Sequence, residues 1–193
     1  MKFSPHNAKI VSAGKQRSPL LFRAFLTREL KFLVIAYKSY ILPLIEYCSP
    51  VWSPHSVGDI LLLGSVQRSY TKRIPGLEQL SYNARLKALN IITLERRRLH
   101  SDLVFCYKLL NGLIGGPPEQ YGLILSNRQS REISFKLVIN NPRIDARKYF
   151  FSSRVCEPWN SLPDSLVRLN SVKAFKRQLF DIDFNKYLYD ANN

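Results

Sequence analysis

The sequence from residue 37 to residue 76 reads YKSYILPLIEYCSPVWSPHSVGDILLLGSVQRSYTKRIPG, and the rest of the chain is organised around it. Its first half carries apolar residues at helical spacing, and Pro43 predicts a kink because proline lacks a backbone N–H donor. The two Ser-Pro pairs around Trp52 predict a turn. Ser56 and Asp59 have the spacing of a capping box, which predicts the start of a second helix. These signals predict two helices joined by a turn, with the Trp52 side chain packed in the core.

Further helix signals follow this stretch. A short helix is expected over residues 81–89, and a longer one from the N-cap Thr93 to the stop signal Asn111-Gly112. Asp145 is expected to cap a helix that reaches Trp159, and Ser171 to cap the last helix. The predicted fold class is therefore mainly α, an irregular helical bundle with a short strand or hairpin around residues 131–140.

Composition shifts divide the chain into four expected parts. Residues 1–18 are a flexible, basic N-terminal segment, and residues 19–114 form a helical domain. The Gly-Pro-rich residues 115–118 open a linker or small hairpin at 115–142. Residues 143–193 form a C-terminal helical segment.

The charge balance points to polyanionic partners. The 193 residues contain 29 Lys and Arg against 14 Asp and Glu, a formal net charge of +15. Nucleic acid is the natural partner of such a chain, and an ordinary solvated basic surface is the alternative. The three dispersed cysteines fit buried thiols in a reducing compartment, and no apolar window is long enough to span a bilayer. We therefore expect an intracellular protein, nuclear or cytoplasmic, without membrane contact.

The sequence offers no catalytic constellation. The three histidines are dispersed, without a second ligand at metal-binding spacing, and no phosphate loop or nucleophile elbow is present. Asp181 and Asp183 could pair on a divalent metal, but a solvated helix end explains them better. We predict no catalytic residue, no metal ligand and no cofactor in this chain.

Basic clusters are the candidate binding residues, because cations neutralise phosphates without reading sequence. Aromatic residues near them, Tyr70, Tyr149 and Phe150, could stack on bases, although periodicity favours the core for Tyr70 and Phe150. Arg98 is also placed to pair with Asp102, four residues on. The candidate nucleic-acid-binding residues are Arg68, Lys72, Arg73, Arg96, Arg97, Arg98, Arg143, Arg147 and Lys148.

Several blocks together support a resemblance to a known family. YKSYILPLIEYCSPVWSP (37–54), the run at 59–77 and LSYNARLKALNIITLERRRLHSDLVFCYKLLNG (80–112) resemble the region after the polymerase core of jockey-like non-LTR retrotransposon reverse transcriptases. The block RIDARKYFFSSRVCEPWNSLPDSLVRLNSVKAFKRQL (143–179) resembles the C-terminal end of the same proteins. The blocks follow the family's order and cover almost the whole chain from residue 9.

The resemblance implies the thumb and C-terminal segment of an RNA-directed DNA polymerase. In that family the palm holds the metal-binding aspartates, and this sequence contains no Asp-Asp pair. Mg²⁺ would therefore belong to a palm domain outside this chain. The chain alone would be catalytically inactive. The implied partners are RNA, an RNA–DNA hybrid or the DNA backbone, together with that palm. The alternatives are a helical protein-interaction scaffold or a non-functional remnant of a mobile element, while an independent polymerase or nuclease would require a metal site.

Overall fold

The computed structural model describes residues 3–126, 135–140 and 142–189. The chain divides into two compact units, Met1–Arg97 with Tyr189–Asn193 (the first unit) and Arg98–Leu188 (the second unit). Helices dominate both units, so the predicted mainly α fold is confirmed. The division falls inside a helix at residue 97 instead of at the expected linker of residues 115–142.

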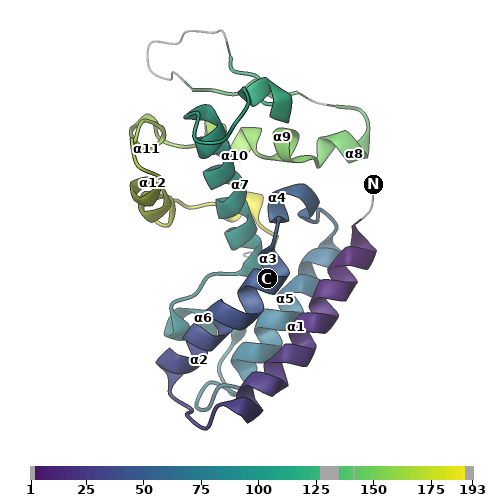
Figure 1. Cartoon of the computed structure of the whole chain (residues 1–193), viewed down its shortest axis with the longest axis vertical. Coiled ribbons are helices and arrows are strands. Elements are labelled where there is room, and N and C mark those ends of the chain that lie inside the picture. Colours follow the sequence, from purple (N-terminus) through teal and green to yellow (C-terminus); the bar gives the residue numbers. More distant parts are fainter. Residues whose placement is uncertain (1–2, 127–134, 141, 190–193) are drawn as a thin grey trace. The chain divides into compact units, whose positions relative to one another are not determined.

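Two long parallel helices form the frame of the first unit. Helices α1 (Ser4–Ala24) and α5 (Val57–Lys72) lie side by side, as Figure 1 shows in purple and light blue. Ser4 donates to Asp59 at their starts, and the Phe22 and Tyr70 rings approach to 5.1 Å at their ends. In between, Gly14 allows a close approach, because a Cβ there would lie 3.1 Å from Val66 Cγ1.

Three short segments follow α1 and correspond to the helix expected before Trp52. They are α2 (Leu30–Ala36), a π-helical turn (Tyr37–Ile41) and α3 (Leu42–Glu46). The irregularity expected at Pro43 takes the form of this π turn, in which the N–H of Leu42 donates to the carbonyl of Tyr37 five residues back. A wider turn moves the preceding carbonyls away from the proline ring.

The turn around Trp52 contains one further helical turn, α4 (Ser49–Trp52), which follows Cys48 in the left-handed region at φ 53°. The Trp52 side chain is buried, and its Nε1 donates to the carbonyl of Tyr47 at 2.7 Å, as expected of a core plug. Ser56 caps α5 by accepting from the N–H of Asp59 at 3.3 Å. Ser81 caps α6 (Tyr82–Leu89) in the same way.

The N-terminal segment differs from expectation. Residues 4–18, expected to be flexible, belong to the 21-residue helix α1, and Asn7, Ile10 and Val11 are buried in it. Pro19 lies inside this helix. The apolar face of α1 packs on α5, and that tertiary contact outweighs the cost of an internal proline.

The second unit is built from one long helix and several short ones. Helix α7 (Leu94–Leu110) starts after Thr93, whose hydroxyl accepts from the N–H of Arg96, and it stops at Gly112 with φ 64°, both as predicted. The short elements are a 3₁₀ turn (Pro118–Tyr121), α8 (Asp145–Lys148), α9 (Phe151–Arg154), α10 (Cys156–Asn160), α11 (Asp164–Val167), α12 (Val172–Leu179) and a second 3₁₀ turn (Asn185–Tyr187).

The single helix expected from Asp145 to Trp159 is wrong: this segment forms α8, α9 and α10. Asp145 lies at the first position of α8 and makes no side-chain cap bond. Phe150, expected in the core, is 50% exposed, because the chain turns between α8 and α9 there. Trp159 is buried as expected and packs in a core with Phe175 and Tyr107, whose rings stack at 4.3 Å.

The expected hairpin is reduced to one antiparallel bridge between Leu125 and Leu137 in the described part of the chain. Asn160 completes it: its amide oxygen accepts from the N–H of Leu137 at 2.9 Å, and its amide nitrogen donates to the carbonyl of Leu137 at 2.8 Å. The side chain thus takes the place of a neighbouring strand. Residues 131–134 of the predicted hairpin, including Ile133, lie outside the described residues.

Candidate nucleic-acid interface

The predicted residue Arg68 has a structural role on α5. Its guanidinium folds back along the helix, donates to the carbonyl of Leu61 at 2.8 Å and lies 5.3 Å from the centroid of the Tyr82 ring. Gly64 makes room for this, since a Cβ there would lie 2.9 Å from Arg68 Nη2. Arg68 therefore helps to hold α6 against α5, and it is only partly exposed.

The other two predicted residues of α5 face solvent. Lys72 is the last residue of α5, and Arg73 is its C-cap; both side chains are exposed. Arg23, also exposed, lies one residue before the end of α1, and the Phe22–Tyr70 contact joins the same two helix ends. We call Arg23, Lys72 and Arg73 the basic end. None of the three makes an ion pair within the residues that the structure describes.

Arg23 was not among the predicted residues, because it lies alone among apolar residues, outside the basic clusters of the sequence. The signal was present: α1 carries Lys9, Lys15, Arg17 and Arg23 and no acidic residue in 21 positions. All four side chains are exposed. Residues 1–97 hold 15 Lys and Arg against five Asp and Glu, so most of the excess positive charge belongs to this part of the chain.

The predicted cluster Arg96–Arg98 does not form one surface. Arg97 makes a bidentate ion pair with Glu46, with Nη2 2.8 Å from Oε2, which ties the start of α7 to the end of α3. Arg98 is buried, with 3% of its surface exposed, and Arg96 is half-buried. Successive helix residues point about 100° apart, so three consecutive arginines cannot share a face.

Asp102 also has a partner that the sequence did not predict. In the second unit Arg154 binds this buried carboxylate through Nε at 2.8 Å and Nη2 at 3.0 Å. Burial raises the pKa of Asp102 above its ordinary value, while Arg154, and Arg98 less strongly, act against that rise. Arg98 therefore contributes its charge to the carboxylate, but the bidentate partner comes from α9.

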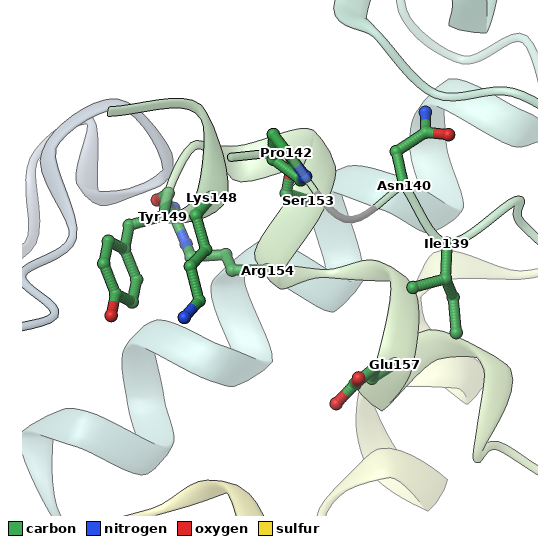
Figure 2. Close-up of a pocket in the computed structure, with 8 residues that line it drawn as sticks. All are labelled: Ile139, Asn140, Pro142, Lys148, Tyr149, Ser153, Arg154 and Glu157. Carbon is green, nitrogen blue, oxygen red and sulfur yellow. The ribbon is translucent and has the colours of Figure 1, made fainter. Parts of the chain in front are cut away.

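Of the last three predicted residues, one lines a pocket in the second unit. Arg143, Arg147 and Lys148 are exposed, and Lys148 lines a cavity of about 400 Å³. Figure 2 shows Lys148, Tyr149 and Arg154 on one side of it and Ile139 and Asn140 on the other. The further lining residues are Pro142, Ser153 and Glu157.

Of the aromatic candidates, Tyr70 belongs to the core, as its periodicity predicted. It is 1% exposed, and its hydroxyl donates to the carbonyl of Leu33 at 2.8 Å. Tyr149 is half-buried, with Lys148 Nζ 5.5 Å from its ring centroid. Only Phe150 and Tyr149 therefore offer ring surface among the three.

The described residues also lack a grouping suited to Mg²⁺. They contain no cluster of three or more His, Cys, Asp or Glu side chains that could hold a metal ion. Asp183 caps the following turn, since its Oδ1 accepts from the N–H of Asn185 at 2.9 Å. Asp181 and Asp183 belong to no such group in the described part of the chain.

No helix among the described residues has the length and apolar character needed to cross a bilayer.

Comparison with other proteins adds no relative. Comparisons with protein-family models, with curated proteins and with solved structures found no match to this chain.

Proposed function

We propose that the first unit binds the backbone of duplex nucleic acid without reading its sequence, with the basic end as the principal contact. The observation that supports this most directly is the meeting of Arg23, Lys72 and Arg73 at one end of two parallel helices. Exposed cations without an intramolecular ion pair remain available for phosphates. An RNA–DNA hybrid is the duplex that we favour, with RNA or DNA duplexes as the other forms.

The charge at this end exceeds what the helices themselves require. Cations near a helix C-terminus stabilise the helix dipole, and two parallel C-termini present together about one negative charge. Arg23, Lys72 and Arg73 supply three positive charges at this end. A positive excess therefore remains, and Lys9 and Lys15 extend it along α1.

The sequence resemblance supports the same role. In reverse transcriptases of the jockey-like kind, the thumb grips the template–primer duplex, and residues 37–112 resemble that region. We propose that this chain performs the gripping, in the nucleus or cytoplasm, and that the metal-dependent polymerisation belongs to a palm domain. By this proposal the chain alone incorporates no nucleotides.

The test is fluorescence anisotropy of the purified chain with a labelled RNA–DNA hybrid across a range of salt. We expect log affinity to fall linearly with log salt, because bound cations displace counterions from phosphates. Replacing Arg23, Lys72 and Arg73 together by Gln should reduce the slope by about 0.9 for each phosphate that the variant no longer neutralises. The matched control removes three charges from α12 in the second unit, through Lys173→Gln, Lys176→Gln and Arg177→Gln.

Equal effects of the two triple variants would show that net charge alone drives binding and would reject the basic end. Absence of binding even at low salt would reject the proposed function. The interaction scaffold or the remnant would then be the better interpretation of the charge.

A further inference from the structure

The pocket in the second unit has an arginine held in one orientation. Arg154 donates from Nε and Nη2 to the two oxygens of Asp102, and from Nη1 to the carbonyl of Tyr149 at 3.1 Å. These bonds lie in the plane of the guanidinium. The Arg154 Cζ lies over the Phe151 ring, 6.0 Å from its centroid. Arg154 also lines the pocket, and 19% of its side chain is exposed, so part of this fixed guanidinium is accessible there.

A fixed guanidinium face selects a flat ligand. Guanidinium planes stack on aromatic rings and on nucleobases, and a plane already held by a buried carboxylate loses little freedom on stacking. Ile139, on the opposite side of the pocket in Figure 2, adds an apolar contact. The pocket volume of about 400 Å³ is in the range of small-ligand sites.

The polar lining has two ends of different charge. The cationic end carries Lys148, with Arg147 next to it in α8, and both side chains are exposed. The other end carries the Glu157 carboxylate of α10, in Figure 2 away from Lys148. An ammonium binds phosphate, whereas a carboxylate accepts from sugar hydroxyls or exocyclic amines.

We propose that this pocket binds a nucleotide, with the base on the face of Arg154, the phosphate at Lys148 and donor groups toward Glu157. A bare inorganic anion would use only the cationic end. A nucleotide uses the flat face, the cation and the carboxylate together. This site lies within the second unit and does not depend on duplex binding by the first.

Two sources of the nucleotide, a free mononucleotide and the end of a strand, can be compared directly. Isothermal titration calorimetry with AMP and UMP tests a free mononucleotide, and short single-stranded RNAs with and without a terminal phosphate test a strand end. If the phosphorylated strand binds more tightly than AMP, the site takes the end of a strand. If AMP binds as tightly as the strand or more tightly, the site takes a free nucleotide. Either result supports the proposal that the pocket binds a nucleotide. Adenosine and inorganic phosphate are the partial ligands.

Lys148→Gln is the informative variant, since the exposed side chain can change without loss of packing. Loss of one charge-assisted bond should weaken AMP binding about tenfold and leave adenosine binding unchanged. Lys173→Gln removes the same charge outside the pocket and should change neither. Equal effects of the two variants, equal affinity for AMP and adenosine, or no saturable AMP binding would overturn the proposal. The basic-end variant should leave AMP binding unchanged, which separates this result from the test of duplex binding.

Discussion

The two units reach a packed core by different means. In the first unit, long helices satisfy their own backbone, and polar side chains such as Gln67 and Tyr82 tie helix to helix. In the second unit, most elements after α7 are four to eight residues long, and side chains bind the backbone between them, as Asn160 does at Leu137 and Trp159 Nε1 at the carbonyl of Phe135. Helical periodicity organises the first unit, and individual side-chain bonds organise the second.

This difference is measurable, because each unit contains one of the two tryptophans. Trp52 lies in the core of the first unit and Trp159 in that of the second, both buried. Trp159→Phe leaves fluorescence that reports on the first unit, and Trp52→Phe leaves fluorescence that reports on the second. Denaturant unfolding followed in these two backgrounds gives each unit its own free energy of unfolding.

The largest expected effect is on the second unit, from Asp102→Asn. Removing the carboxylate charge leaves Arg154 uncompensated, which should lower the free energy of unfolding of that unit by about 3 kcal/mol. Asp164→Asn removes the more exposed pair with Arg168, at 2.6 Å, and should cost no more than about 0.5 kcal/mol. The Trp52 signal should not change. A similar cost for both variants would mean that the buried pair is not what holds α9 to α7.

Alkaline pH should lower the free energies of unfolding of the two units to different extents, with a smaller effect than Asp102→Asn has. Burial raises the pKa of Cys156 to about 11, and that of Cys106 well above its ordinary value; both lie in the second unit. In the first unit the groups whose pKa values burial raises are tyrosines, and the pKa of Tyr70 is raised to about 12. A folded state that holds a proton more tightly than the unfolded state loses stability as pH rises between the unfolded and folded pKa values.

The second unit should therefore weaken from about pH 9, where an unfolded thiol ionises, by about 1.4 kcal/mol per pH unit for each thiol. The first unit should weaken only from about pH 10, where an unfolded tyrosine ionises. Unfolding curves at pH 8, 9 and 10 in the two single-tryptophan backgrounds measure this order. Cys156→Ala should reduce the loss in the second unit, and simultaneous weakening of both units would contradict the assignment.

The smallest effect compares two helix caps. Ser56 accepts from a backbone N–H at the start of α5, whereas Ser171 holds the same position before α12 and makes no such bond. Ser56→Ala should cost about 1 kcal/mol in the first unit, and Ser171→Ala only a few tenths in the second. Thermal unfolding in the same two backgrounds measures both. Equal costs would indicate that Ser171 caps its helix in solution.

The quality of sequence-based prediction follows the same division. The starts of α5, α6 and α7 were predictable because Ser56, Ser81 and Thr93 carry local capping signals. Helix α1 was not, because no side chain caps its first turn and Pro19 argues against it; its stability comes from packing on α5. The break between α8 and α9 depends partly on Arg154, which bonds the carbonyl of Tyr149 and belongs to a pair 52 residues apart in sequence.

The candidate site shows where composition stops being informative. Lys72 and Arg73 were predictable as exposed cations at a helix end. Arg97 was not recognisable as a structural residue, because Glu46 is 51 residues away in sequence. The pocket depends on residues brought together from α8, α9, α10 and the segment before them, and its single sequence signal was the basic run that includes Lys148.

The π turn at Tyr37–Ile41 fixes the length of its segment. The π turn contains one residue more than a regular α-helix would use between Ala36 and Leu42. Deleting Ser39 would remove that extra residue and restore a regular α-helix with the segments on either side in nearly the same phase, so that Ile41 and Ile45 would stay in the core. A deletion of one residue from the regular turns of α2 or α3 would instead rotate the residues beyond it by about 100°, so the π turn is the place in this segment where the loss of one residue changes the packing least.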